Sequence, residues 1–266
     1  MNKLIIAIGL LLLSIPLYAG VALDMVRTDT SGEEIERNEI FAQSGMLRID
    51  SGGGPFSSDV SMIFLGDKFL VVDHDEKSYI IMDEAMLDAV SSKISEAMKQ
   101  MEAQLASMPP EQRAMAEQMM QSQMPGMMGD EESTPMRVEA IGPGEWRGRD
   151  CTRYAVFIGP EKYQDVCAAP LDKVDGSADM MEAFHGMAKF VKKLTESLPG
   201  PLAASISDNP GAVMEEIDGF PVHSVEYQYG QATGEVSLQS IVEQELEASV
   251  FAAPDGYRLE DPFAGR

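Results

Sequence analysis

Three short apolar runs that lie close together constrain the fold of this chain most. Each has four hydrophobic residues in a row between polar, turn-forming segments: Met62–Leu65, Phe69–Val72 and Tyr79–Met82. Their length and their β-branched and aromatic residues favour strands. Because successive side chains of a strand point to opposite faces, these runs are apolar on both faces. The sheet that contains them must therefore be covered on both sides or curl around an apolar interior.

Further short segments with clustered or alternating apolar residues, separated by Gly, Asp, Ser and Pro, indicate more strands. Short connections make most of them antiparallel neighbours. The expected strands are Ala22–Thr30, Glu34–Gln43, Gly45–Ser51, Asp59–Leu65, Lys68–Asp73, Lys77–Asp83, Met136–Gly142, Glu145–Ile158, Glu161–Ala168, Phe220–Gly230 and Gly234–Glu247.

Two segments with apolar residues at spacings of three and four predict amphipathic helices. The first covers Asp83–Met108, and after two prolines a shorter helix is expected over Glu111–Gln123; together they form a helical, Met-rich insertion at about residues 84–135. The second covers Ser177–Leu198. With the doubly apolar strands, these helices favour an α+β fold: an incomplete, strongly curved antiparallel β-barrel with amphipathic helices packed on its concave side.

The first nineteen residues predict a signal peptide, because the basic Lys3 precedes the apolar run Leu4–Leu13 and a small residue, Ala19, follows Pro16. The run is about half of the ~20 residues that span a membrane. We expect cleavage after Ala19, with Ala22 as a second candidate, and a periplasmic domain over residues 20–266. No other segment of the sequence is apolar enough to cross a membrane as a helix.

The chain is acidic, with 44 Asp and Glu against 20 Lys and Arg and a net charge of −24. Such a surface repels phosphate backbones and anionic lipid headgroups. The composition therefore disfavours nucleic acid as a partner, and it disfavours electrostatic docking on a membrane.

The two cysteines, Cys151 and Cys167, lie on either side of a predicted hairpin turn near Gly159. In an oxidising compartment we expect them to be bonded to each other. Closing a loop of this size is worth about 3 kcal/mol in the chain-entropy model. A redox-active or metal-binding pair is less favoured, because it would need a Cys-x-x-Cys spacing or further soft ligands nearby.

The sequence contains no recognisable catalytic constellation. Neither a Gly-x-Ser-x-Gly elbow nor a His-Glu-x-x-His motif occurs, and the three histidines, His74, His185 and His223, are scattered. We expect a protein that is not an enzyme and carries no cofactor.

Methionine is concentrated between Met115 and Met136. Thioethers suit Cu(I), so Met120, Met124 and Met127 are candidate copper ligands. Methionine also fills adaptable apolar surfaces, which is the more common use.

Five segments, taken in order, resemble an uncharacterised family of exported bacterial proteins with a LolA/LolB-like fold: Met46–Asp50, Leu70–Asp83, Gly148–Tyr154, Gly219–Val222 and Ala248–Tyr257. The resemblance implies an incomplete, strongly curved antiparallel barrel with helices packed into or across its open concave side. In the lipoprotein carriers that share this architecture, the concavity holds acyl chains.

The expected function is therefore binding of an apolar ligand, a lipid or an acylated peptide, between sheet and helices. Candidate lining residues come from the three apolar runs: Ile63, Leu65, Leu70, Val72, Ile80 and Met82. Three alternatives stay open: a dry core packed by the same residues, a Met-rich copper-binding protein, and a module that docks an envelope protein through residues 84–128.

Overall fold

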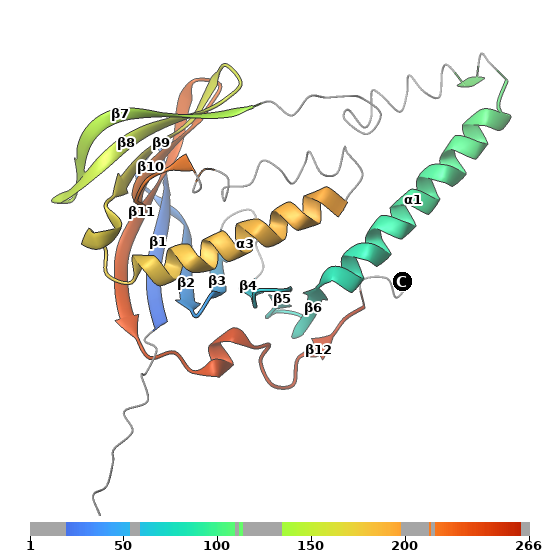
Figure 1. Cartoon of the computed structure of the whole chain (residues 1–266), viewed down its shortest axis with the longest axis horizontal. Coiled ribbons are helices and arrows are strands. Elements are labelled where there is room, and N and C mark those ends of the chain that lie inside the picture. The colour runs from blue at the N-terminus through green and yellow to red at the C-terminus, as the bar shows by residue number, and fades with distance from the viewer. Residues whose placement is uncertain are drawn as a thin grey trace, which may run out of the picture.

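The computed structural model describes residues 20–53, 59–109, 112–113, 135–197, 213 and 216–261. Its strands form one sheet in the order β12-β6-β5-β4-β3-β2-β1-β11-β10-β9-β8-β7. All neighbouring strands are antiparallel except β12 and β6, which are parallel. The sheet is curved and open, with β12 at one end and β7 at the other (Figure 1). The expected α+β architecture with a mostly antiparallel sheet is present.

All of the predicted strands occur, with shifts at their ends. In chain order the strands are β1 (Gly20–Asp29), β2 (Glu34–Gln43), β3 (Met46–Gly53), β4 (Val60–Phe64), β5 (Phe69–Asp73), β6 (Ser78–Met82), β7 (Met136–Trp146), β8 (Arg149–Ile158), β9 (Glu161–Ala169), β10 (Phe220–Gln228), β11 (Gln231–Gln244) and β12 (Arg258–Leu259).

The predicted boundary between β7 and β8 is wrong. A break was expected after Gly142, but β7 continues to Trp146 and the turn falls at residues 147–148. The register of the β7–β8 pair shifts between Ala140 and Gly142, which marks a bulge. A bulge in a strand at the end of a sheet accommodates Pro143, which has no N–H to donate.

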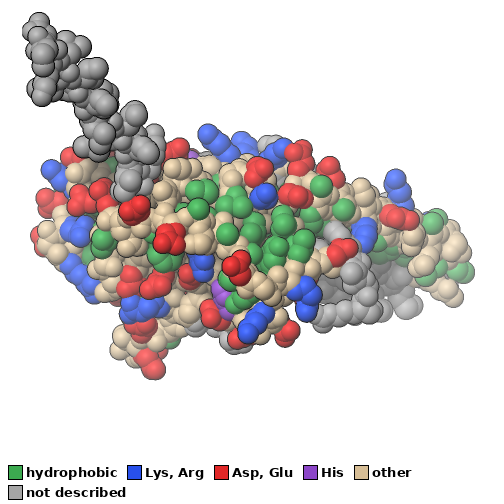
Figure 2. All heavy atoms as spheres, turned by 90° about the horizontal axis from the view of Figure 1, so that it is seen from below, with side chains coloured by type: hydrophobic (Ala, Val, Ile, Leu, Met, Phe, Trp, Pro, Cys, Tyr) green, Lys and Arg blue, Asp and Glu red, His purple; other side chains and the backbone are tan. Residues whose placement is uncertain are grey.

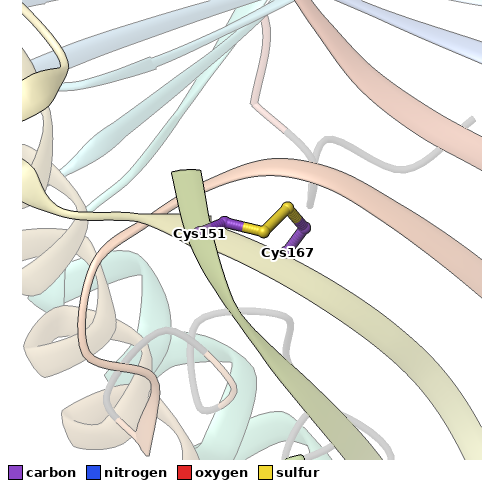
Figure 3. The surroundings of a disulfide bond; sticks show 2 residues. All are labelled: Cys151 and Cys167. Atoms are coloured by element: carbon purple, nitrogen blue, oxygen red, sulfur yellow. A yellow bond between two sulfur atoms is a disulfide. The ribbon is translucent and has the colours of Figure 1, made fainter. Parts of the chain in front are cut away.

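The disulfide joins the β8–β9 hairpin (Figure 3). The Cα atoms of Cys151 and Cys167 are 5.5 Å apart. Cys167 pairs in register with Arg153, so the bond runs diagonally across the two strands. The position of the two-residue turn and a one-residue shift in register between Val156 and Phe157 together produce this two-residue offset, and the turn lies at Gly159 as predicted.

Helix α3 (Ser177–Ser197) crosses the inside of the curved sheet (Figure 1). Its residues Met180 and Ala183 are fully buried in the main core, together with Val21, Leu47 and Phe64 from the strands. A short 3-10 helix, η1 (Leu171–Lys173), precedes it. The prediction of an amphipathic helix on the concave side is confirmed for α3.

Helix α1 (Glu84–Ser107) differs from this expectation. It begins directly after β6, where the Asp83 side chain caps its first turn by accepting a hydrogen bond from the N–H of Met86. It contacts α3 and β6 and then extends away from the sheet (Figure 1). Its buried Leu87 belongs to the first turn, next to α3. The rest of α1 therefore does not pack on the concave face. The predicted helix over residues 111–123 lies outside the described residues except for 112–113.

The C-terminal segment, for which the sequence analysis predicted no element, covers the outer face of β3 to β6. It contains the 3-10 helix η2 (Ala248–Phe251) and β12. Phe251 is buried among Ile63, Leu70 and Val72. Figure 2, a view from below, shows hydrophobic side chains in the middle of this face with charged ones around them.

A chain of polar groups holds the same segment, with Ser61 buried and its partners partly buried. Tyr257 Oη lies 3.0 Å from His74 Nδ1, and His74 Nε2 lies 2.7 Å from Ser61 Oγ. Ser61 in turn donates to Asp50, while Arg48 donates to Asp50 and to the carbonyl oxygen of residue 250. These bonds link the C-terminal segment to β3 and β4.

Candidate functional site

The concave face carries a continuous apolar row that crosses seven strands. Its members are partners in successive strand pairs, so their side chains point to the same side of the sheet. In order across the sheet they are Ile241, Leu23, Ile40, Ile49, Met62, Val71 and Ile80. Leu23 is 3% exposed, whereas Met62 is 42% exposed. The row is therefore buried at β1 and open to solvent at β4.

A second apolar row runs beside the first and is covered by α3. Its members are Val21, Ala42, Leu47, Phe64, Phe69 and Met82. All belong to or pack against the core that contains Met180 and Ala183 of α3. Helix α3 thus lies along one row and leaves the Met62 end of the other exposed.

A cavity of about 400 Å³ opens where α1, α3 and the β4–β5 turn meet. It is lined by Gly66, Asp67, Glu84, Leu87, Asp88, Gly186, Lys189, Phe190 and Lys193. Its volume lies within the roughly 300–1,000 Å³ that is usual for small-molecule sites.

An aromatic cluster lies beneath this cavity. The ring centroids of Phe64 and Phe69 are 5.0 Å apart, and Phe190 meets them edge-on at 5.9 and 5.3 Å. Phe64 and Phe69 are buried, whereas Phe190 also lines the cavity. The cavity therefore leads to the aromatic part of the main core.

The rim of the cavity is charged. Lys193 Nζ on α3 lies 3.1 Å from Glu84 Oε2 on α1, and both side chains are about two-thirds exposed. An exposed ion pair of this kind contributes roughly 0–1 kcal/mol. The ion pair therefore adds little to the α1–α3 contact, which also contains the buried Leu87.

The structure separates the six candidate lining residues into two groups. Four of them, Ile63, Leu65, Leu70 and Val72, pack with Phe251 and the C-terminal segment on the outer face. Ile80 and Met82 point to the concave face, because they pair with Val71 and Phe69. The six residues therefore do not line one cavity.

The residues that the sequence analysis missed on the concave face are Met62, Phe64, Phe69 and Val71. The signal that could have identified them is the alternation of side chains along a strand, which sends every second residue of a run to the same face. The β4–β5 turn pairs Phe64 with Phe69, and the β5–β6 turn pairs Val71 with Ile80. Those registers place every second residue of the three runs on one face.

Ser61 and His74 are at the distance of a nucleophile and its base, but the geometry indicates a structural role. Ser61 is 1% exposed and its hydroxyl donates to Asp50. No substrate atom can reach Oγ in this arrangement. The pair instead anchors the C-terminal segment through Tyr257.

The candidate copper ligands Met120, Met124 and Met127, like the predicted signal peptide, lie outside the described residues. Within the described part of the chain, no group of three or more His, Cys, Asp or Glu side chains could hold a metal ion. None of the helices in those ranges is long and apolar enough to span a membrane.

No protein-family model matches the sequence. No curated protein matches it either. Among solved structures, the fold is similar to an uncharacterized conserved protein from Thermus thermophilus, with a TM-score of 0.45 and 6% identity over 92% of this chain and 91% of that one.

Two other solved structures have lower TM-scores. The comparison with PNGF-II gives a TM-score of 0.40 and 8% identity, and it covers 91% of this chain and 30% of the PNGF-II chain. The LolA superfamily protein NE2245 from Nitrosomonas europaea gives a TM-score of 0.31 and 6% identity over 90% and 91% of the two chains. Likenesses this remote carry no argument about function.

Proposed function

We propose that this protein is a non-enzymatic periplasmic protein that holds an apolar ligand, a lipid or an acylated peptide, against the concave face of its sheet. One observation carries the proposal: the apolar row beside α3 is continuous over seven strands and includes Met62, which is 42% exposed. Apolar side chains aligned along a concave surface offer a long contact for a hydrocarbon chain.

The cavity between α1 and α3 provides the second contact for such a ligand. Leu87 and Phe190 supply apolar surface, and Lys189 and Lys193 lie at the rim. In this proposal, an acyl chain lies beside α3 while a polar head stays at the charged rim, where Lys193 and Glu84 are exposed.

The disulfide supports the periplasmic assignment. The bond between Cys151 and Cys167 is of a kind that forms and persists in oxidising compartments and is rare in the cytosol. It does not select a ligand.

The proposal is tested by extracting the purified protein with organic solvent, analysing the extract by mass spectrometry, and displacing a bound apolar dye with fatty acids. Met62→Glu places a charge in the exposed part of the row and should weaken dye binding about tenfold or more, since a charged group resists transfer to an apolar contact.

Leu259→Glu is the matched control, because Leu259 is also a half-exposed apolar residue but lies on β12, away from the concave face. Its dye affinity should equal that of the wild type. Absence of both copurified lipid and displaceable dye would refute the proposal, as would equal losses in the two variants.

A further inference from the structure

A second cavity, of about 210 Å³, lies at the tip of the β7–β8 hairpin. It is lined by Trp146, Arg147, Arg149, Val222, Leu238 and Gln239. The arrowhead of β7 in Figure 1 marks this tip, which lies at the opposite end of the molecule from α1. The pocket is therefore separate from the apolar site beside α3.

A tight turn brings the two arginines of this pocket together. Trp146 pairs with Arg149, so the turn has two residues, Arg147 and Gly148. Both have positive φ, of 48° and 79°, which is the backbone of a type I′ turn. The hairpin therefore fixes both guanidinium-bearing residues beside one indole ring.

These arginines differ from most others in the described part of the chain. Arg113 donates to the backbone carbonyl oxygens of Leu105 and Ala106. Ion pairs with carboxylates are formed by Arg27, Arg37, Arg48, Arg137 and Arg258. By contrast, none of the described carboxylates lies within ion-pair distance of Arg147, Arg149 or Arg153, all on this hairpin. Arg147 donates only to the amide oxygen of Gln239, at 2.9 Å. In a chain with 44 acidic residues, this concentration of uncompensated positive charge selects an anionic ligand.

Trp146 forms one wall of the pocket. The ring stacks on His223, with centroids 3.6 Å apart and planes 8° apart, and the guanidinium carbon of Arg147 lies 5.4 Å from the ring centre. Its Nε1 is buried and has no partner among the described residues. The stacked rings hold the wall in place beside the two arginines.

We propose that this pocket binds an oxyanion, a carboxylate or a phosphate. The two guanidinium groups recognise the oxygens, as planar forks do for such groups. Val222 and Leu238 are buried and close the back of the pocket. This site does not depend on the apolar-ligand function proposed above.

Trp146 is the one tryptophan of the chain, so intrinsic fluorescence reports directly on this pocket. The probes are acetate and inorganic phosphate, with sodium chloride at the same ionic strength as the blank. We expect a saturable change in emission with at least one of the two oxyanions beyond that with sodium chloride. The tighter of the two oxyanions identifies the class of ligand.

The double substitution Arg147→Gln/Arg149→Gln should weaken binding of the tighter oxyanion about tenfold or more, which corresponds to about 1.4 kcal/mol. Arg137→Gln/Arg258→Gln is the matched control, since it removes the same charge from two exposed arginines outside the pocket. Its affinity should equal that of the wild type, and calorimetry should give the same ranking of variants.

Two results would overturn the inference: no saturable change with either oxyanion beyond that with sodium chloride, or equal losses in the two double variants. The Met62→Glu variant separates the two proposals, because it should leave binding at this pocket unchanged.

Discussion

Gly186 in the middle of α3 lies directly over the ring of Phe64 on β4. A Cβ built on Gly186 would be 3.2 Å from Cε1 of Phe64, which is tighter than an ordinary van der Waals contact. Phe64 is 1% exposed and is held by Phe69 and Phe190, so its ring has little room to move. The helix reaches the sheet at this point because the residue has no side chain.

We predict that Gly186→Ala does not stabilise the protein, although alanine is favoured over glycine within helices by about 1 kcal/mol. The new methyl group presses on Phe64 and offsets the gain in propensity. Denaturant unfolding of a double-mutant cycle with Phe64→Leu checks this. Gly186→Ala should be more favourable in the Phe64→Leu background; a full gain in the wild-type background would contradict the contact.

Ser61→Ala should lower the free energy of unfolding by about 1–3 kcal/mol, the cost of leaving buried polar partners unsatisfied. His74 Nε2, Asp50 and Arg48 would all lose a partner at once. Ser249→Ala is the control, because that hydroxyl is exposed and makes one contact of 3.3 Å to Glu247. Chemical denaturation should show little change for Ser249→Ala, and an equally small change for Ser61→Ala would refute the structural role of the chain.

Reduction of the disulfide should lower the free energy of unfolding by about 3 kcal/mol, as expected for a loop of this length. Denaturation curves with and without reductant measure the difference. The Cys151→Ala/Cys167→Ala variant should match the reduced protein and should not respond to reductant. A response in that variant would show that the reductant acts elsewhere.

The β1–β2 turn gives a pH-dependent prediction. The hydroxyl of Ser31, and then the N–H of Glu33, hold the pKa of Asp29 below its ordinary value of 3.8. The contribution of Asp29 to stability is therefore complete at pH values above 3.8, the pKa expected in the unfolded chain. It is lost as the pH falls through the lower pKa of the folded state. NMR titration of the Asp29 carboxyl should show this midpoint, and Ser31→Ala should move it towards 3.8. An unchanged midpoint in the Ser31→Ala variant would show that Ser31 does not cause the lowered pKa of Asp29.

Local patterns were sufficient to predict the strands and α3. The short apolar clusters of β4, β5 and β6 and the three- and four-residue spacing in α3 are signals within single elements. The disulfide could also be predicted from a local pattern, since its two cysteines flank one hairpin turn.

Contacts between distant segments could not be predicted in this way. Tyr257 meets His74 across 183 positions of sequence, and no local pattern encodes that pairing. The two-residue β12 is too short to produce a periodic signal. Four candidate lining residues were therefore assigned to a ligand, whereas Phe251 from the C-terminal segment packs against them.

The position of β7 at the end of the sheet has a consequence for solubility. Its outer edge carries N–H and C=O groups that β8 does not use, and such edges pair readily with strands of other molecules. Pro143 removes one donor, and the bulge before Gly142 twists the strand. Both features make this edge a poor partner for a strand of another molecule.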